Sequence, residues 1–67
     1  MKRKCIEILN TIFGVGNWLK DDLYKTTDGS WEYCADDGWD IKFQLCDNEV
    51  YYSLYDGQEL IERGKYA

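Results

Sequence analysis

Carboxylates are the reactive groups that this sequence offers in greatest number. Aspartate and glutamate supply 13 of the 67 residues, and the chain has three cysteines and no histidine. Without histidine, a serine or cysteine nucleophile has no imidazole to activate it, and the usual zinc ligand sets cannot form. Paired carboxylates could hydrolyse a glycosidic bond, but that chemistry needs a sugar-sized cleft, for which a chain of this length leaves little room. The sequence therefore predicts a protein that is not an enzyme and carries no cofactor.

Three features of the sequence could be mistaken for ligand-binding motifs. Gly14, Val15 and Gly16 resemble the start of a phosphate-binding loop, but residue 19 is leucine and no Lys-Ser or Lys-Thr pair follows. The glycines are better explained as the end of a helix. The acidic residues could bind calcium, yet no DxDxDG loop is present, and Cys34 and Cys46 lack a companion pair for a metal-thiolate site. We expect no metal.

Charge and hydropathy limit the class of partner. The net charge is −5 and the pI is about 4.4, which argues against a general affinity for nucleic acids or anionic membranes and favours a protein with a basic surface. No apolar run approaches the roughly 18 residues that span a bilayer. The odd number of cysteines indicates reduced thiols. We therefore expect the protein to lie in the cytoplasm.

The stretch from Trp39 to Cys46 alternates between apolar and polar side chains, the pattern of a strand with one buried face. Asp47 and Asn48 follow, and both tolerate the left-handed backbone of a two-residue hairpin loop. A slip of one residue would place charged groups on the apolar face, so loop and pattern predict one register. That register pairs Leu45 with Val50, Phe43 with Tyr52, and Ile41 with Leu54.

Two further hairpins precede this one. A three-residue loop at 36–38 sets Tyr33 against Ile41 and Trp31 against Phe43. A second three-residue loop at 27–29 would bring Leu23 to the core face beside Tyr33. A two-residue loop at Asp28 and Gly29 remains an alternative, and it would turn Leu23 outward.

An apolar stripe at helical spacing occupies the N-terminal segment. Cys5, Ile8, Leu9, Ile12 and Phe13 recur at i, i+3, i+4, i+7 and i+8. Trp18 and Leu19 are expected to pack in the corner between this helix and the sheet, with a role for Trp18 as an exposed anchor as the alternative. At the other end, residues 58–63 read as an edge strand, although Asp56 and Glu59 also match the capping box of a short helix.

The predicted fold is therefore α+β, with one N-terminal helix packed across a four- to five-stranded antiparallel β meander. The chain forms one small domain, residues 1–67. The helix covers about 2–13, and the strands cover about 21–26, 30–35, 39–46 and 49–55, with a further one at 58–63.

Loops of a meander alternate between its two ends, so the register predicts which acidic residues gather. Asp36, Asp37 and Asp40 share one end with Asp56 and Glu59, and with the strand entry at Asp21 and Asp22. Such a cluster could steer and orient a basic partner. Aspartate is also common in hairpin loops for conformational reasons alone.

The outer face of the predicted sheet is the second candidate surface. Tyr51, Ser53 and Tyr55 point away from the helix, beside Cys34 and Cys46. Tyrosine is enriched in protein interfaces because it combines rigid contact area with a polar tip, although it also has high β propensity.

These features together predict a non-enzymatic, acidic protein-binding module. The analogy of size and charge is with small inhibitors that phages and mobile elements direct against nucleic-acid-binding host proteins, of the anti-CRISPR type. Its predicted contact residues are Asp21, Asp22, Asp36, Asp37, Asp40, Asp56, Glu59, Tyr51 and Tyr55. The alternative is a structural protein, such as a homodimer, that self-associates through the tyrosine face and an edge strand.

Overall fold

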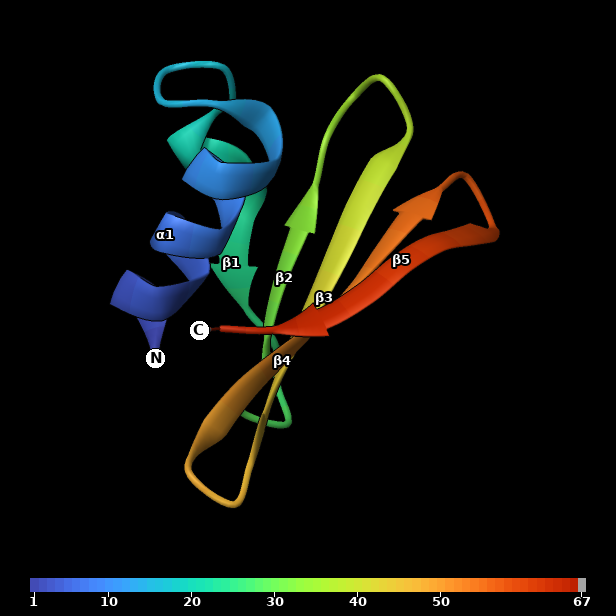
Figure 1. Ribbon diagram of the computed structural model, residues 1–67. Coiled ribbons are helices and arrows are strands. Elements are labelled where there is room, and N and C mark those ends of the chain that lie inside the picture. Colours follow the sequence, from blue (N-terminus) through green and yellow to red (C-terminus); the bar gives the residue numbers. More distant parts are fainter. Residues whose placement is uncertain (67) are drawn as a thin grey trace.

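The protein is an open five-stranded antiparallel sheet with one helix against one of its faces (Figure 1). The computed structural model describes residues 1–66. The strands lie in the sheet in sequence order, β1-β2-β3-β4-β5. The predicted α+β meander is confirmed. Its elements are α1 (Lys2–Phe13), a 3-10 turn η1 (Lys20–Asp22), β1 (Leu23–Lys25), β2 (Trp31–Cys34), β3 (Trp39–Cys46), β4 (Glu49–Asp56) and β5 (Glu59–Lys65).

Helix α1 has the predicted bounds and the predicted buried stripe. Cys5, Ile8 and Leu9 are its buried residues, and they face the apolar side of the sheet. The helix ends at Gly14, whose φ of 95° is rarely adopted by other residues. The Gly14 N–H still donates to the Asn10 carbonyl at 2.9 Å, so the last turn is closed.

The β3–β4 register is the one that the sequence predicts. Leu45 pairs with Val50, and Phe43 with Tyr52. The two-residue loop between the strands has φ values of 53° at Asp47 and 65° at Asn48. Both are left-handed, as a tight hairpin loop requires and as these residue types tolerate.

The two earlier hairpins also have their predicted three-residue loops. Tyr33 pairs with Ile41 on one side and with Leu23 on the other. In the first loop, the Thr26 N–H donates to the Ser30 carbonyl at 2.8 Å. The alternative two-residue loop is therefore wrong, and Leu23 is buried on the core face.

Asp28 organises the β1–β2 loop. Its carboxylate accepts hydrogen bonds from the Ser30 hydroxyl at 2.6 Å, from the Ser30 N–H at 3.0 Å and from the Thr26 hydroxyl. These bonds, that of the Ser30 hydroxyl above all, lower the pKa of Asp28 to about 2. The ionised form is thus the one that the folded loop holds.

This low pKa predicts a pH-dependent effect of Asp28→Ala. An unfolded aspartate titrates near pH 4, so the carboxylate stabilises the fold above about pH 4 and ceases to do so as the pH falls towards about 2. Asp28→Ala should therefore lower the melting temperature at pH 7 and have a vanishing effect near pH 2. Thermal unfolding across this range measures it, with Asp28→Asn as the variant that keeps an acceptor. A difference between wild type and Asp28→Ala that does not shrink on acidification would contradict the role of the charge.

The strand bounds differ most from the prediction at β1 and β5. Strand β1 begins at Leu23 because residues Lys20–Asp22 form a 3-10 turn, closed by the Asp22 N–H on the Leu19 carbonyl at 3.0 Å. The C-terminal segment is a strand, so the capping-box helix is wrong, and β5 extends to Lys65. A bulge at Leu54 and Tyr55 shifts the β4–β5 register, which the alternation of β5 does not signal.

Gly64 in β5 leaves room for the ring of Tyr52. The ring of Tyr52 lies over it, so an added Cβ would approach Tyr52 atoms to 2.7–2.8 Å. The Tyr52 hydroxyl donates to Glu62 at 2.9 Å on the same strand. The Tyr52 side chain on β4 thus contacts and stabilises the edge strand β5.

The core lies between α1 and the centre of the sheet, and it is smaller than the apolar pattern suggests. Phe43 and Ile41 are fully buried, whereas Leu45, on the same face of β3, is 59% exposed. A 12-residue helix is about 18 Å long, and an 8-residue strand is about 26 Å long. The tip of the β3–β4 hairpin extends past the helix (Figure 1), and Leu45 on that tip is uncovered, whereas its cross-strand partner Val50 is buried.

Candidate functional site

Three connections meet at one end of the sheet and bring acidic residues together. The β2–β3 loop and the β4–β5 loop are joined by a hydrogen bond from the Gly57 N–H to the Gly38 carbonyl at 2.9 Å. The segment between α1 and β1 lies at the same end, the upper edge of Figure 1. We call this the acidic end. It holds Asp36 and Asp37 in one loop, Asp56 and Glu59 around the next, and Asp21 and Asp22 in η1.

A hollow of about 370 Å³ lies between the α1–β1 segment and the β2–β3 loop. Of the predicted acidic contacts, only three line it, Asp22, Asp36 and Asp37. Its remaining walls are formed by Trp18, Leu19, Tyr33, Ala35 and the backbone around Gly16 and Asn17. We call it the acidic hollow. It combines aromatic side chains with a carboxylate rim.

The pKa of the buried Tyr33 hydroxyl is affected by the carboxylates of this rim. The hydroxyl oxygen accepts a hydrogen bond from the Leu19 N–H at 3.4 Å, which ties β2 to η1. Burial raises the pKa of Tyr33, and the negative charges of Asp22, Asp37 and Asp36 raise it further. The three carboxylates therefore act on one point of the hollow, although they come from two separate segments.

Trp18 forms the inner wall of the acidic hollow. Its indole N–H donates to the Asn10 side chain at 2.7 Å, and its ring meets Tyr33 edge-on at a centroid distance of 6.2 Å. The predicted packing of Trp18 between helix and sheet is confirmed. Leu19 was expected to pack with it, but that expectation is wrong, because the Leu19 side chain is mostly exposed.

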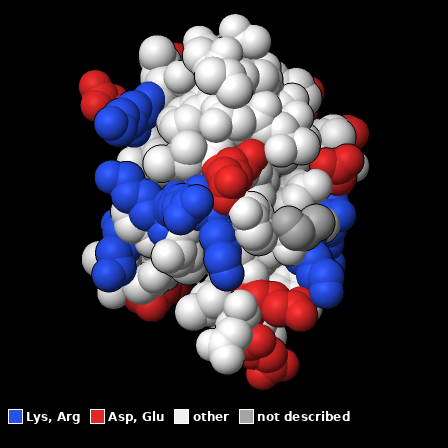
Figure 2. Space-filling model, turned by 60° about the vertical axis from the view of Figure 1, so that its left-hand side comes forward, with Lys and Arg blue, Asp and Glu red and all other residues white. Residues whose placement is uncertain are grey.

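The exposed apolar residues next to the hollow are not among the predicted contacts. Leu19 is 64% exposed and Val15 is 83% exposed. A glycine-flanked valine in a short connection is a signal that sequence reasoning could have used, since such a residue has no strand or helix face to bury it. Figure 2 shows the broad uncharged surface of this part of the molecule above a group of basic side chains.

Asp40 is at the acidic end but faces the outer side of the sheet. It pairs with Cys34 on β2 and with Tyr55 on β4, and one of its carboxylate oxygens is buried without a hydrogen-bond partner in residues 1–66. The neighbouring Asp40 carboxylate raises the pKa of the Cys34 thiol to about 11. Burial raises the pKa of Cys5 to about 11 as well. Both thiols are protonated at neutral pH, and all three cysteines are free.

The predicted contacts Tyr51 and Tyr55 lie on the outer face, on β4. Tyr51 is 41% exposed, and its hydroxyl donates to Glu49 at 3.0 Å. Tyr55 is half-buried under Lys42, whose ammonium lies 5.5 Å from the ring centroid. The structure thus places the tyrosines on a different surface from the acidic hollow.

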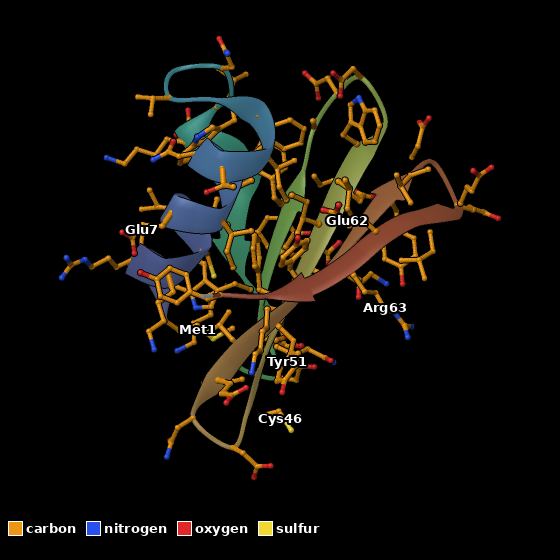
Figure 3. All side chains as sticks on the ribbon, viewed as in Figure 1. Met1, Glu7, Cys46, Tyr51, Glu62 and Arg63 are labelled. Atoms are coloured by element: carbon orange, nitrogen blue, oxygen red, sulfur yellow. The ribbon has the colours of Figure 1, made fainter. Side chains whose placement is uncertain are left out.

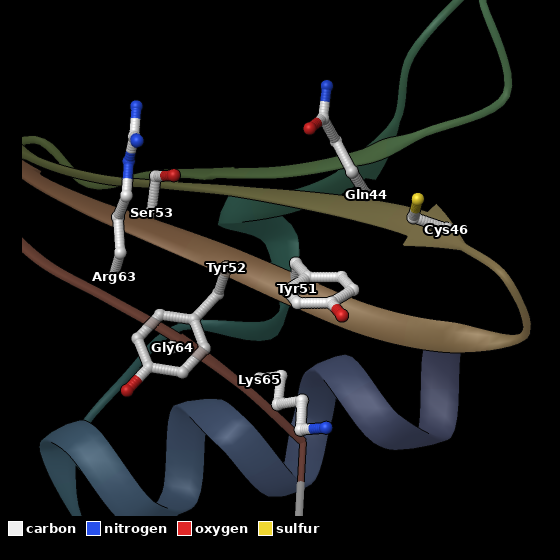
Figure 4. Close-up of a pocket in the computed structure, with 8 residues that line it drawn as sticks. All are labelled: Gln44, Cys46, Tyr51, Tyr52, Ser53, Arg63, Gly64 and Lys65. Atoms are coloured by element: carbon white, nitrogen blue, oxygen red, sulfur yellow. The ribbon is translucent and has the colours of Figure 1, made fainter.

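A groove of about 610 Å³ runs along the outer face between β4 and β5 (Figure 4). It is separate from the acidic hollow, with which it shares no residue. We call it the outer groove. Its lining residues are Gln44, Cys46, Tyr51, Tyr52, Ser53, Arg63, Gly64 and Lys65.

The basic residues at the start of α1 are placed over aromatic rings. The ammonium of Lys2 lies 5.9 Å from the Trp31 ring, and that of Lys4 lies 5.7 Å from the Tyr66 ring. Helix α1 has no acidic residue in its first turn, where the helix dipole would favour one. These cations lie away from the acidic end, so the charge of the molecule is unevenly distributed.

Residues 1–66 contain neither a metal-ligand cluster nor a membrane-spanning helix. No group of three or more Cys, Asp or Glu side chains in this range is arranged to hold a metal ion. Within the same range, no helix has the length and apolar character needed to cross a bilayer.

Comparison with known proteins gives one partial similarity. No family model and no solved structure matches the chain. Myricetin 7/4'-O-methyltransferase 2 from Solanum habrochaites and its namesake from Solanum lycopersicum are each 51% identical to it over 35 residues, which covers 45% of this chain. The chain spans about a tenth of the length of these curated relatives. The matched segment is too small a part of the methyltransferases to carry their activity to this chain.

Proposed function

We propose that the protein is a non-enzymatic binding module whose acidic end docks on a basic surface of another protein. The observation that supports this most is the acidic hollow, in which Asp22, Asp36 and Asp37 rim a depression walled by Trp18 and Tyr33. A protein interface commonly combines a desolvated apolar anchor with charges that orient the partner. The hollow and its exposed neighbours offer both.

The exposed apolar residues and the rim carboxylates would have different roles in binding. The apolar surface of Leu19 and Val15, exposed by 64% and 83%, would be buried on binding and would supply affinity. The rim carboxylates would attract a basic partner at long range and raise the association rate. Aspartates outside the hollow, such as Asp21 and Asp56, would add to this attraction without direct contact.

A basic surface on a protein often serves to hold nucleic acid, because lysine and arginine neutralise phosphates. A negatively charged module that covers such a surface excludes the nucleic acid from it. We therefore propose inhibition of a nucleic-acid-binding host protein as the biological role, in the manner of small phage or mobile-element inhibitors. Protonated, unpaired thiols suit a reducing compartment, and we propose that the module acts in the cytoplasm.

Self-association through the edge of β5 is less well supported. Two copies that pair antiparallel about a twofold axis set residues of the same sheet face opposite each other. Glu62 and Arg63 point to opposite faces, because they pair with the inward Leu54 and the outward Ser53. With the twofold axis at residue 62, Glu62 would meet Glu62, and with the axis at residue 63 or 64, Arg63 would meet Arg63 or Lys65. Like charges opposite each other destabilise a pair.

Capture from a bacterial lysate tests the proposed function. Tagged protein should retain a partner at low ionic strength and release it at high ionic strength, because exposed charges are screened by salt. Excess duplex DNA or RNA should displace the partner if its basic surface is the site of contact. Partners that stay bound at high salt and are not displaced by nucleic acid would contradict the proposal. Recovery of the tagged protein only as its own dimer would also contradict it.

A further inference from the structure

The outer groove is lined by cations, although the chain as a whole is acidic. Arg63 and Lys65 line it, and the Glu49 carboxylate at its edge contacts both Lys65 and the Tyr51 hydroxyl at 3.0 Å, which leaves Arg63 as the uncompensated charge among the described residues of the groove. The chain as a whole has net charge −5. A concave surface of this sign favours an anionic ligand, since nearby cations raise the local concentration of anions.

Three hydrogen-bonding side chains in the groove are not used by the fold. Arg63 forms no ion pair or side-chain hydrogen bond within residues 1–66, and the same is true of Gln44 and Ser53. Lys65 differs, because its ammonium contacts Glu49 at 3.0 Å. The available cation is therefore Arg63, whose planar guanidinium can bind a carboxylate or phosphate through two parallel hydrogen bonds.

The register places these groups on the same face of three neighbouring strands. Ser53 pairs across β4 and β5 with Arg63, and its small side chain leaves space above the strand. Gln44 pairs with Tyr51, one position further along the same face. Figure 4 shows Arg63, Ser53 and Gln44 rising from the same side of the sheet. Figure 3 shows Arg63, Tyr51 and Cys46 away from α1.

Tyr51 supplies a flat apolar surface next to these donors. Its hydroxyl donates to Glu49, two residues earlier on the same strand, so the ring is held along β4. A ring fixed at its hydroxyl end and 41% exposed presents contact area to a planar group. The volume of about 610 Å³ is in the range of pockets that hold small molecules.

We infer that the outer groove binds a small planar molecule that carries one anionic group. Arg63 and the Ser53 hydroxyl hold the anion, the Tyr51 ring stacks on the planar part, and the Gln44 amide contacts its polar edge. The ligand binds on the opposite side of the sheet from the core and on different residues from the acidic hollow. The site is thus independent of the proposed docking function.

Two pairs of probes test this site and separate the possible sources of the anion. Adenosine monophosphate offers a phosphate and N-acetyltryptophan a carboxylate, and adenosine and N-acetyltryptophanamide are their uncharged counterparts. Titrations followed by amide chemical shifts should show saturable changes on β4 and β5 for at least one anionic probe. Its uncharged counterpart should bind at least about tenfold more weakly, the factor expected for the loss of one charge-assisted hydrogen bond. Which anionic probe binds identifies the source.

Substitutions decide whether Arg63 carries the binding. Arg63→Gln should weaken the anionic probe about tenfold or more, whereas Arg63→Lys, which keeps the charge but loses the planar fork, should weaken it less. Arg3→Gln is the matched control, since it removes an exposed arginine on α1. Equal binding of charged and uncharged probes, equal losses in Arg63→Gln and Arg3→Gln, or no saturable binding by any probe would each overturn the inference.

Discussion

Phe43→Ala should remove a large share of the free energy of unfolding of this protein. Phe43 is fully buried at the centre of the core, and removal of such a ring costs about 3–5 kcal/mol. A chain of 67 residues has a total stability of about 3–10 kcal/mol, so this one change consumes a large share of it. Circular dichroism and a urea titration at one temperature measure the loss.

Leu45→Ala is the matched control for this prediction. Leu45 lies on the same strand and the same face as Phe43, but it is 59% exposed beyond the end of α1. Its removal should change the free energy of unfolding by about 0.5 kcal/mol or less. Comparable losses in the two variants would mean that the helix covers the whole hairpin, against the packing described above.

The triple change Asp22→Asn, Asp36→Asn and Asp37→Asn should slow partner association about 10- to 100-fold at low ionic strength. Asparagine keeps the shape of each side chain and, at position 37, the acceptor for the Trp39 N–H at 3.3 Å. The fold is therefore retained while the rim charge is removed. Association rates measured over a salt series should also show a flatter salt dependence than the wild type.

A second triple variant, Glu32→Gln, Asp47→Asn and Glu62→Gln, removes the same net charge away from the acidic hollow. These residues lie on β2, in the β3–β4 loop and on β5. Association of this variant should slow much less than that of the rim variant, since attraction depends on distance to the charge. Equal slowing by both would mean that total charge alone is responsible and that the acidic hollow has no special role.

Local signals in the sequence were sufficient for most of the fold. The apolar stripe ending at Gly14 defines α1, and strict alternation defines β3. Asp47 and Asn48 then determine the register, because a loop of two left-handed residues admits one pairing of the flanking strands. Each of these features depends on residues close together in the chain.

Features that depend on distant residues were not predictable. The 3-10 turn before Leu23 accompanies the bond from the Leu19 N–H to Tyr33, 14 residues away. The exposure of Leu45 depends on where a helix of a given length lies on the sheet, which periodicity does not reveal. Leu19 looked like a core residue for the same reason.

The candidate site was likewise only partly predictable from local sequence signals. The register correctly brought Asp36, Asp37 and Asp22 to one end of the sheet, because loops alternate between the ends of a meander. It could not show that these three rim a hollow, because that depends on how the α1–β1 segment packs against β2. The position of Asp40 on the outer face beside Cys34, by contrast, follows from the alternation of β3 and the three-residue loop.

The most direct test of the acidic end as a docking surface is an amide chemical-shift map of the labelled protein with a captured partner. We expect the largest changes at residues 15–22 and 35–38, which form the acidic hollow and its exposed neighbours. Changes confined to the outer face of β4 and β5, with none at the hollow, would contradict the proposed function.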